Sequence, residues 1–505
     1  MKRVKLLSLL LSLSLLLAAC AGPAAPTGSS ASPSPSVSPT DTTPSASPTD
    51  TTPSASPEVS RDTTVDFVVV GAGMAGLSAA TEAAQQGSSV LLLEKLSFAG
   101  GSSALCEGYL WASGSQMNEA CGIGYTPEKM KEFFKQCGGD VVVPGLIDNM
   151  VDVSGEIFDK LNEEGVLFSK ETFTTSGSVL APDLQVFVAE GAGSGMIQSM
   201  VARAEKAGVE IRYESPAVDL IVEDGAVAGV TVEDSEGTYQ VRAGTTILAT
   251  GGFLMNEEMM EEYMPLWAGL HPLCTVGATG DGHRMAIELG AQMIGDNTTG
   301  TWGWDGQNGY KMEGGLAPML SMFITNLEGQ RFGSELDPLK NANILHQTGR
   351  KAYCFFDSNS SYVQLLEQSV AAGLTVKADT LEELAQSVGM DADALLATVE
   401  AYNAAAADGS DAFGMPAAAM TPLTTAPYYM SILSPEIPNA TLMGLKVNEF
   451  GQIVDGSDQP IPNLYGAGEL ILGSVVNDRY PTCGSCLGAG AYVGVVAVRH
   501  ALGLM

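Results

Sequence analysis

A glycine-rich turn and a carboxylate stand at the spacing that binds a dinucleotide. The segment Gly71-Ala72-Gly73-Met74-Ala75-Gly76 places three glycines within one turn, and Glu94 stands 23 positions after Gly71. Glycines at these places allow a tight turn, close approach of the backbone to a pyrophosphate, and close helix–strand packing. A carboxylate at that distance accepts a hydrogen bond from a ribose hydroxyl. The expected dinucleotide contacts are therefore Gly71, Gly73, Met74, Ala75, Gly76 and Glu94.

The segments around this turn are those that a nucleotide site requires. Residues 65–70 (VDFVVV) are typical of a buried parallel strand, and the turn leads into a helix that runs to about Gln86. Residues 88–93 are typical of a second strand, which ends at Glu94. The amides and the dipole of the helix N-terminus favour a phosphate. The glycine motif alone has the alternative of a simple turn, but this context favours the nucleotide.

Later glycine-rich segments resemble those of one flavoprotein family. They are Gly100-Gly101-Ser102-Ser103, the segment 250–253 (TGGF) after an expected strand at 245–249, the segment 277–282 (GATGDG) and the segment 463–469 (NLYGAGE). In this order the set resembles the fumarate reductase flavoprotein superfamily, which includes urocanate reductases and 3-ketosteroid dehydrogenases. The resemblance covers about residues 64–500 and implies FAD as the cofactor. The alternative is that these glycines serve turns alone.

The resemblance also implies roles for single residues at the cofactor. Glu469 should bind the ribityl chain, and the amides of residues 488–490 should point at the N1/O2 edge of the flavin. A helix N-terminus at that edge stabilises the negative charge of a reduced flavin. The further expected cofactor contacts are Lys95, Gly101, Ser102, Ser103, Gly251, Gly252, Thr279, Asp281, Gly468, Leu487 and Gly488.

The implied fold class is α/β: a Rossmann-like FAD-binding domain with an inserted α+β capping domain that carries part of the substrate site. The FAD-binding domain is expected at residues 62–296 plus 440–505, and the cap at 297–439. Within the cap, residues 320–335 (LSMFITNLEGQRFGSE) match the family's apolar strand, turn and Arg-Phe element. Residues 214–249 are typical of a β meander at the edge of the FAD-binding domain, with turns at 223–225 and 235–237.

The resemblance implies hydride transfer from reduced flavin to the β-carbon of an activated double bond. Charge then develops on the conjugated carbonyl or carboxylate and needs cations or hydrogen-bond donors, while an acid protonates the α-carbon. The arginine acid of fumarate reductases is absent, because the position eight residues after Arg331 is Leu339. The family's substrate histidines are replaced near Trp302 and at 439–441. A strict fumarate reductase is therefore not expected.

Neighbouring residues near the C-terminus are the expected catalytic groups. Arg479, ten positions after Glu469, matches the family's substrate arginine, and a planar guanidinium suits a carboxylate. Tyr480 and Gly484 match the Tyr-Pro-x-x-Gly element with which ketosteroid dehydrogenases polarise a ring carbonyl. The alternatives are a surface arginine beside Asp478 and a core tyrosine before a turn.

Trp302 and Trp304 are two of only four tryptophans, and they stand where the family keeps polar substrate contacts. Aromatic walls there would suit an aryl or otherwise apolar substrate. The alternative for both is core packing.

The pair Cys483 and Cys486 forms a Cys-x-x-Cys segment with no second pair elsewhere to complete a zinc or iron–sulfur set. No metal site is therefore predicted. Small residues buried beside the flavin are the favoured interpretation, and a labile disulfide is the alternative.

The N-terminal residues are typical of a targeting signal rather than of a folded domain. Three basic residues precede an apolar stretch at 6–17, as in a secretory signal. The segment Leu17-Ala18-Ala19-Cys20 resembles the lipobox of bacterial lipoproteins, which implies a signal peptide at 1–19 and a lipid on Cys20. The alternative is an ordinary signal with a chance cysteine. Residues 20–61 are rich in Pro, Ser and Thr and are expected to be a disordered linker.

Composition excludes two broad classes. Of the 505 residues, 45% are hydrophobic, so the chain can bury a core and is not disordered throughout. Lys plus Arg number 24 against 58 Asp plus Glu, and a net charge of −34 repels nucleic-acid phosphates.

The sequence therefore predicts an FAD-dependent oxidoreductase acting on CH-CH groups, lipid-anchored to the cell membrane on its extracytoplasmic face. The expected reaction is reduction of a small α,β-unsaturated carboxylate or carbonyl in anaerobic respiration. Because no haem motif or FMN module is found in the chain, electrons are expected from a separate flavoprotein or cytochrome, or from a quinol. The alternatives are a 3-ketosteroid-type dehydrogenase and a flavin electron carrier without turnover.

Overall fold

The computed structural model describes residues 61–505 apart from 123–124, 170–172, 175–183, 296–298, 302–322, 338–339, 436 and 478–479. The part of the chain from Ser60 to Met505 forms one unit. The predicted signal peptide with Cys20, and the linker up to residue 60, lie outside the described residues. Trp302, Trp304 and Arg479 also lie outside them.

An eight-stranded sheet contains the predicted nucleotide turn. Its strands run in the order β18-β19-β9-β1-β2-β6, and β8 joins it by pairing with β9 and β7. The parallel pairs are β1–β2, β1–β9, β2–β6 and β9–β19. Runs of buried Val and Leu form β1 and β2 because both faces of a parallel sheet are covered. The strands are β1 (Thr63–Val70), β2 (Val90–Leu93), β6 (Glu210–Arg212), β7 (Ala217–Glu223), β8 (Ala226–Asp234), β9 (Gly237–Leu248), β18 (Gln452–Val454) and β19 (Pro460–Gly466).

The register of this sheet brings four strand ends to one edge. Val70 at the end of β1 lies opposite Leu93 of β2 and Leu248 of β9, and Leu248 lies opposite Gly466 of β19. The chain leaves each of these strands at its carboxyl end. Four of the glycine-rich or acidic motifs therefore start side by side, although they are far apart in the sequence.

The predicted β meander is present, but its position differs from the prediction. β7, β8 and β9 are antiparallel neighbours, with turns at 224–225 and 235–236. The expectation that the whole meander lies at the edge was wrong for β9, which lies between β1 and β19 in the sheet. β9 is long enough to continue past its pairing with β8 and take a central parallel place, which local alternation does not reveal.

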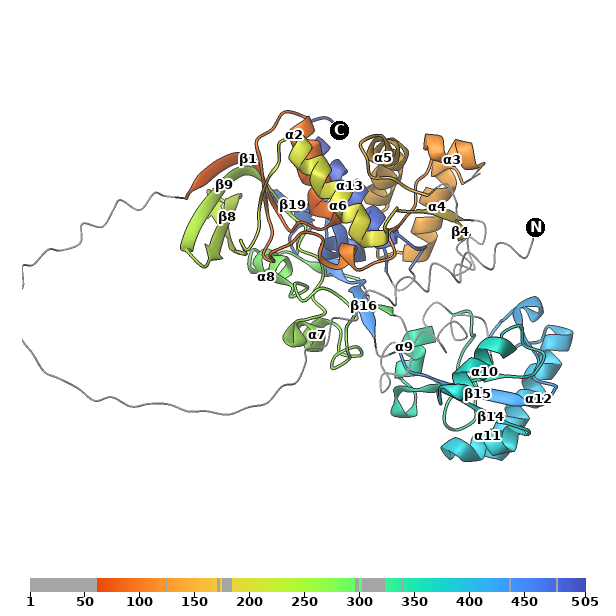
Figure 1. The fold of residues 1–505 in the computed structure, drawn as a ribbon. Helices are drawn as coiled ribbons and strands as arrows, with labels where there is room; N and C mark the ends of the chain where they lie inside the picture. The colour runs from red at the N-terminus through yellow and green to blue at the C-terminus, as the bar shows by residue number, and fades with distance from the viewer. Residues whose placement is uncertain are drawn as a thin grey trace, which may run out of the picture. The chain divides into compact units, whose positions relative to one another are not determined.

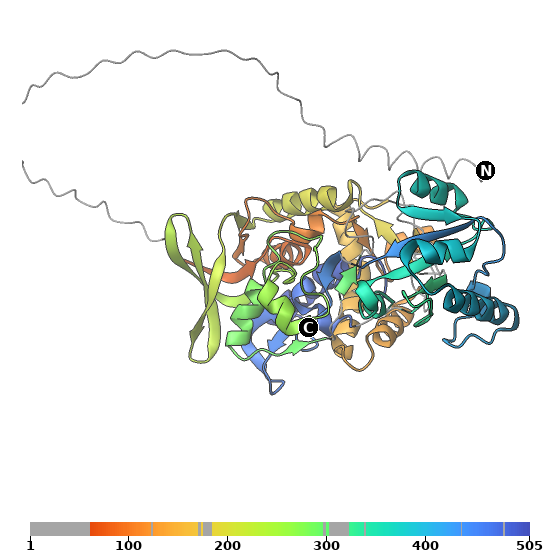
Figure 2. The same cartoon turned by 90° about the horizontal axis from the view of Figure 1, so that it is seen from below.

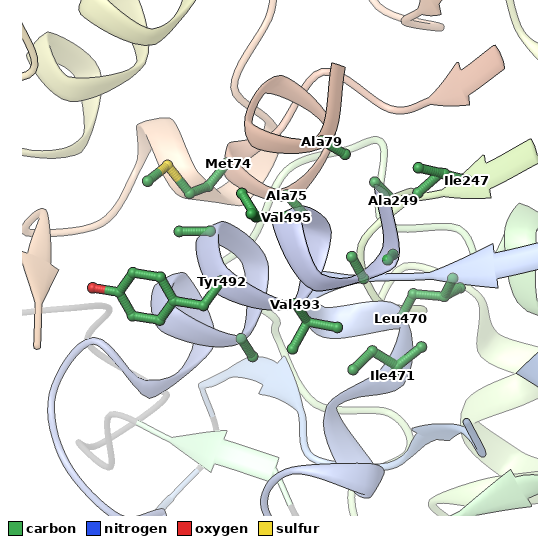
Figure 3. Packing of buried hydrophobic residues seen from close by; sticks show 14 of the residues in the cluster. Met74, Ala75, Ala79, Ile247, Ala249, Leu470, Ile471, Tyr492, Val493 and Val495 are labelled. Atoms are coloured by element: carbon green, nitrogen blue, oxygen red, sulfur yellow. The ribbon is translucent and has the colours of Figure 1, made fainter. Parts of the chain in front are cut away.

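Helices from both ends of the described chain pack together next to this sheet (Figures 1 and 2). Gly494 of α13 lies against α2, because a Cβ added there would come within 2.9 Å of the Ala75 carbonyl oxygen. Figure 3 shows Ala75 of α2 and Val495 of α13 in this packed core. The helices are α2 (Met74–Gln85), α3 (Gln116–Cys121), α4 (Pro127–Gly138), α5 (Pro144–Glu163), α6 (Ala192–Lys206), α7 (Glu257–Tyr263), α8 (Asp281–Glu288) and α13 (Ser485–Ala501), with the 3-10 turns η2 (Gly101–Ala104) and η7 (Gly468–Ser474).

Three smaller sheets complete this part of the protein. One has the order β3-β5-β4, and the other two are the antiparallel pairs β10–β17 and β11–β16. Their strands are β3 (Tyr109–Leu110), β4 (Phe173–Thr174), β5 (Gln185–Val188), β10 (Met293–Ile294), β11 (Thr299–Thr301), β16 (Pro438–Thr441) and β17 (Gly444–Leu445).

A four-stranded antiparallel sheet, the cap sheet, forms between β11 and β16 in the sequence, in the order β12-β13-β15-β14. Its alternating side chains build two cores: Phe355 and Met430 pack with α11 and α12, whereas Cys354 and Tyr429 pack with α10. Figure 1 labels β14 and β15 beside these helices. The elements are β12 (Phe323–Thr325), α9 (Lys340–Leu345), η5 (Thr348–Arg350), β13 (Ala352–Phe356), α10 (Val363–Ala371), β14 (Thr375–Ala378), α11 (Leu381–Val388), α12 (Ala392–Asp408), η6 (Ala417–Ala419) and β15 (Tyr428–Leu433).

Arg331 of the predicted Arg-Phe element packs against residues of the loops and helices beside the cap sheet. Arg331 forms an ion pair with Glu335 at 2.6 Å and a second with Asp411. Its guanidinium also lies 4.9 Å from the ring centre of Tyr402. The α/β class with a parallel sheet is thus confirmed, while the domain boundaries at 297 and 439 stay predictions.

Candidate cofactor and substrate site

A cavity of about 540 Å³ lies at the edge where the parallel strands end. Its lining includes Gly71 after β1, Glu94 after β2, Gly251 after β9 and Gly468 after β19. Ligands of open α/β sheets bind at the carboxyl ends of the strands. Of the predicted cofactor residues, those that line this cavity are Gly71, Gly73, Met74, Ala75, Glu94, Lys95, Gly101, Ser102, Ser103, Gly251, Gly252, Asp281, Gly468, Glu469 and Leu487.

The three glycines of the first turn have different surroundings. Gly71 has φ of 102°, and a Cβ there would lie 2.4 Å from the Ala249 carbonyl oxygen. A Cβ at Gly76 would lie 1.8 Å from the Gly71 carbonyl oxygen, so this glycine allows the helix to pack on the strand. A Cβ at Gly73 would meet no described atom closer than 3.8 Å. Gly73 therefore presents its open side to the cavity, as a pyrophosphate site requires.

The Glu94 carboxylate is held in place by the backbone. The Ala72 amide donates to Oε2 at 2.9 Å, and the Leu96 amide donates to Oε1 at 2.8 Å. A carboxylate has about four acceptor positions, so both oxygens can still accept from a ribose hydroxyl. The structure thus ties Glu94 to the glycine turn itself, which the spacing alone did not predict.

Lys95, Thr279 and Asp281 form one polar cluster. The Lys95 ammonium lies 2.6 Å from Thr279 Oγ1 and 2.7 Å from Asp281 Oδ2. Asp281 stands in the first turn of α8, where a negative charge is favoured. Thr279 and Gly76 do not line the cavity: Thr279 is linked to it through Lys95 and Asp281, and Gly76 shapes the turn.

Glu469 is anchored by Thr441, a residue that sequence reasoning did not assign to the cofactor. The Thr441 amide donates to Glu469 Oε1 at 2.8 Å, and its hydroxyl donates to the same oxygen at 3.2 Å. Gly252 makes room for this carboxylate, because a Cβ there would lie 2.1 Å from Oε1. Burial raises the pKa of Glu469 to about 7, although its hydrogen bonds with Thr441 act in the opposite direction.

The last helix, α13, starts at Ser485, three residues before the predicted flavin-facing amides of residues 488–490. The Gly488 amide donates to the Gly484 carbonyl oxygen at 2.8 Å, and a Cβ at Gly488 would lie 2.4 Å from Trp111 Nε1. Gly488 does not line the cavity, whereas Leu487 does. The contact of Leu487 and Gly488 with a cofactor stays a prediction.

Tyr480 and Gly484 line the same cavity as the glycine turn. The Tyr480 phenol oxygen accepts from the Cys486 amide at 2.9 Å, and its side chain is 40% exposed. Gly484 has φ of 83°, and a Cβ there would lie 2.5 Å from the Tyr109 carbonyl oxygen. The structure therefore brings the predicted substrate element to the cofactor motif. Arg479, Trp302 and Trp304 lie outside the described residues.

Sequence reasoning missed Tyr109 and Cys106, which line the cavity on the same stretch of chain. Neither residue belongs to a sequence motif. Their place at the cavity depends on β3 and its pairing with β5, which sequence patterns did not predict. Cys483 and Cys486 also line the cavity, and no disulfide joins the seven described cysteines. Within the described ranges no cluster of His, Cys, Asp and Glu could hold a metal ion, and no helix is long and apolar enough to cross a membrane.

The residues present fit FAD. Gly73 leaves open space at the turn, Glu94 and Glu469 offer acceptors for hydroxyl groups, and the buried Thr250 hydroxyl has no described hydrogen-bond partner. The fold and the site thus define a dinucleotide-binding flavoprotein. The family described as "FAD binding domain" matches residues 66–487, so the chain belongs to this family and is an FAD-dependent oxidoreductase.

Relatives with known activities cover most of the chain. A urocanate reductase from Eggerthella lenta is 32% identical over 83% of this chain and 72% of its own length. A fumarate reductase (cytochrome) from Shewanella frigidimarina is 30% identical over 81% of this chain and 72% of its own length. The crystal structure of a 3-ketosteroid-Δ4-(5α)-dehydrogenase from Rhodococcus jostii matches 89% of this chain and 98% of its own, with a TM-score of 0.74 and 26% identity. The predicted superfamily and FAD are confirmed.

Proposed function

We propose that this protein reduces the double bond of a small α,β-unsaturated carboxylate or carbonyl compound. The observation that carries the proposal is that one cavity joins the dinucleotide turn at Gly71–Gly76 to the Tyr480–Gly484 segment. The similarity to a urocanate reductase and to a fumarate reductase supports the reductive direction.

Bound FAD would supply the hydride, and the chain would supply position and polarisation. Gly71, Gly73 and Glu94 would hold the pyrophosphate and ribose, while Glu469 would accept from the ribityl hydroxyls. The Tyr480 oxygen accepts from the Cys486 amide, and its hydroxyl is also hydrogen-bonded to the Cys486 side chain, so donation to a substrate would replace that second bond. We assign Tyr480 to the conjugated oxygen of the substrate, where negative charge develops. Arg479 is its proposed partner for a substrate carboxylate, and Trp302 and Trp304 are proposed as aromatic substrate walls.

A second candidate is dehydrogenation of a ketosteroid-like substrate. The Tyr480–Gly484 segment and the similarity to the Rhodococcus ketosteroid dehydrogenase favour it. In the reductase, Tyr480 would polarise the conjugated oxygen of an unsaturated acceptor, whereas in the dehydrogenase it would polarise the ring carbonyl of a saturated donor. Tests with acceptor and donor compounds therefore separate the two reactions. A flavin carrier without turnover is the third candidate.

The decisive experiment is anaerobic. The FAD-loaded protein is reduced with a viologen, and flavin reoxidation is followed after addition of fumarate, urocanate, cinnamate-type acrylates or steroid enones. Rapid reoxidation by an acrylate or a dicarboxylate supports the reductase. Reduction of oxidised flavin by a saturated ketosteroid, without reoxidation by any acrylate, would favour the dehydrogenase. No response to any compound would favour the carrier.

We further propose that Cys20 carries a lipid, which anchors the protein on the extracytoplasmic face, and that a separate protein or a quinol supplies electrons in anaerobic respiration. The lipobox-like segment before Cys20 supports the anchor. Cys20→Ala should move the protein from the membrane fraction to the soluble fraction, whereas Cys121→Ala should not. Rapid reduction of the flavin by NADH alone would contradict the separate donor.

A further inference from the structure

Three thiols line the cavity together with Tyr480: Cys106, Cys483 and Cys486. The Cys106 thiol donates to the Ser103 carbonyl oxygen at 3.1 Å, and its sulfur accepts from the Gly108 amide at 3.4 Å. Cys106 is therefore held by backbone groups of its own loop. Cys483 and Cys486 instead stand on the two sides of the Gly484–Ser485 step at the start of α13.

The two cysteines stand on either side of a tight turn at the start of α13. Cys486 is the second residue of α13, and Cys483 immediately precedes the N-cap residue Gly484. The turn is fixed by Ser485, whose amide and hydroxyl both donate to the Thr482 carbonyl oxygen, at 3.1 and 2.8 Å. Gly484 has φ of 83°, so helical backbone begins only after Cys483. A Cys-x-x-Cys pair at a helix N-terminus is the arrangement in which thiol–disulfide oxidoreductases form their disulfide.

We propose that Cys483 and Cys486 are a redox-active dithiol site, which a small-molecule disulfide oxidises to an intramolecular disulfide and thereby blocks the substrate end of the cavity. Cys483 is exposed and reacts first. Its sulfur attacks one sulfur of the small disulfide, which forms a mixed disulfide and releases one small thiol. The Cys486 sulfur then displaces the second small thiol. The protein loses two hydrogens, and one small disulfide becomes two thiols.

Oxidation acts on the group that positions Tyr480. The Cys486 amide is the donor to the Tyr480 phenol oxygen, so the new bond constrains the residue that holds the phenol. Burial raises the pKa of both thiols, that of Cys486 to about 12. Because the thiolate is the attacking form, the raised pKa slows this exchange, so the disulfide should form slowly at neutral pH.

Disulfide formation can be tested without a substrate, whereas the block of turnover rests on the proposed reductase function. FAD-loaded full-length protein is incubated with glutathione disulfide, alkylated and mapped by peptide mass spectrometry. On the same samples, reoxidation of the viologen-reduced flavin is measured with fumarate, urocanate and a cinnamate-type acrylate. We expect a Cys483–Cys486 disulfide in the wild type and in the matched control Cys106→Ser. Turnover should fall in both and return with dithiothreitol. In Cys486→Ser, we expect the mixed disulfide to remain on Cys483.

Two results would overturn the proposal. If Cys483 and Cys486 are alkylated as fully after glutathione disulfide as before it, the dithiol site is wrong. If the disulfide forms but turnover is unchanged, the block of the substrate end is wrong. Mass mapping uses no substrate, so failure of the proposed reductase function leaves the first result readable.

Discussion

Thr441 holds the Glu469 carboxylate through one oxygen, with its amide at 2.8 Å and its hydroxyl at 3.2 Å from Oε1. Both hydrogen bonds use Oε1, so Oε2 is left for a ligand. Burial raises the pKa of Glu469 to about 7, so the protonated form is favoured in the folded protein below that pH. The folded protein therefore binds this proton more tightly than the unfolded chain does. As the pH rises from about 4.5 through about 7, the free energy of unfolding falls because this advantage of the protonated carboxyl is lost.

FAD affinity should therefore depend on pH. Ribityl hydroxyls that donate to Glu469 favour its ionised form, so the FAD dissociation constant should fall as the pH rises towards 7, by at most about tenfold per pH unit. Fluorescence titration of FAD into the FAD-free protein measures this constant. Glu469→Gln should bind FAD more weakly and without this pH dependence. Glu107→Gln, a carboxylate variant of the same cavity, should keep the dependence, and loss of it there would contradict the assignment to Glu469.

Removal of the Tyr480 hydroxyl should slow the reaction without loss of the cofactor. Tyr480→Phe removes a donor to the charge that develops on the substrate, which reduces kcat by about 100-fold or more. FAD content should stay the same because the cofactor motifs are untouched. Tyr428→Phe on the cap sheet is the matched control. A Tyr480→Phe enzyme as fast as this control would show that another group polarises the substrate.

Substitutions of the first-turn glycines should separate folding from cofactor binding. Gly73→Ala adds a Cβ at least 3.8 Å from described atoms, so the chain should fold but bind FAD poorly because the methyl group occupies ligand space. Gly76→Ala puts a Cβ 1.8 Å from the Gly71 carbonyl oxygen and should lower the melting temperature as well. Gly456→Ala, which meets no atom within 4 Å, is the control. Full FAD binding by Gly73→Ala would argue against a pyrophosphate at this turn.

Acid should destabilise the fold through His283. Complete burial in α8 lowers its pKa to about 3, below the ordinary value of 6.5. The unfolded chain takes up a proton below pH 6.5 and the folded chain does not, so the free energy of unfolding falls by about 1.4 kcal/mol per pH unit between about 6.5 and 3 from this group. Urea unfolding at several pH values measures this dependence. The free energy of unfolding should change less with pH in His283→Gln than in the exposed control His271→Gln. Equal slopes would contradict this assignment.

The local parts of the site could be predicted from sequence, and the tertiary parts could not. The turn at Gly71–Gly76 and the strand ending at Glu94 follow from short-range spacing and apolar runs. Local patterns did not indicate that Thr441 would anchor Glu469, because the two residues meet only when β16 lies beside η7. The central place of β9 was missed for the same reason. Tyr480 was placed by resemblance, and its hydrogen bond with Cys486 depends on the start of α13.

The pairing of β11 with β16 has a consequence for how this protein could diversify. Gly300 lies opposite Ala440, so the chain departs towards the cap sheet and comes back at adjacent points. A segment attached through neighbouring points can be exchanged, shortened or enlarged without changing the strand order that builds the cofactor cavity. Grafting the corresponding segment of a relative between these two strands would therefore test whether the cap sheet sets the substrate range on an unchanged flavin scaffold.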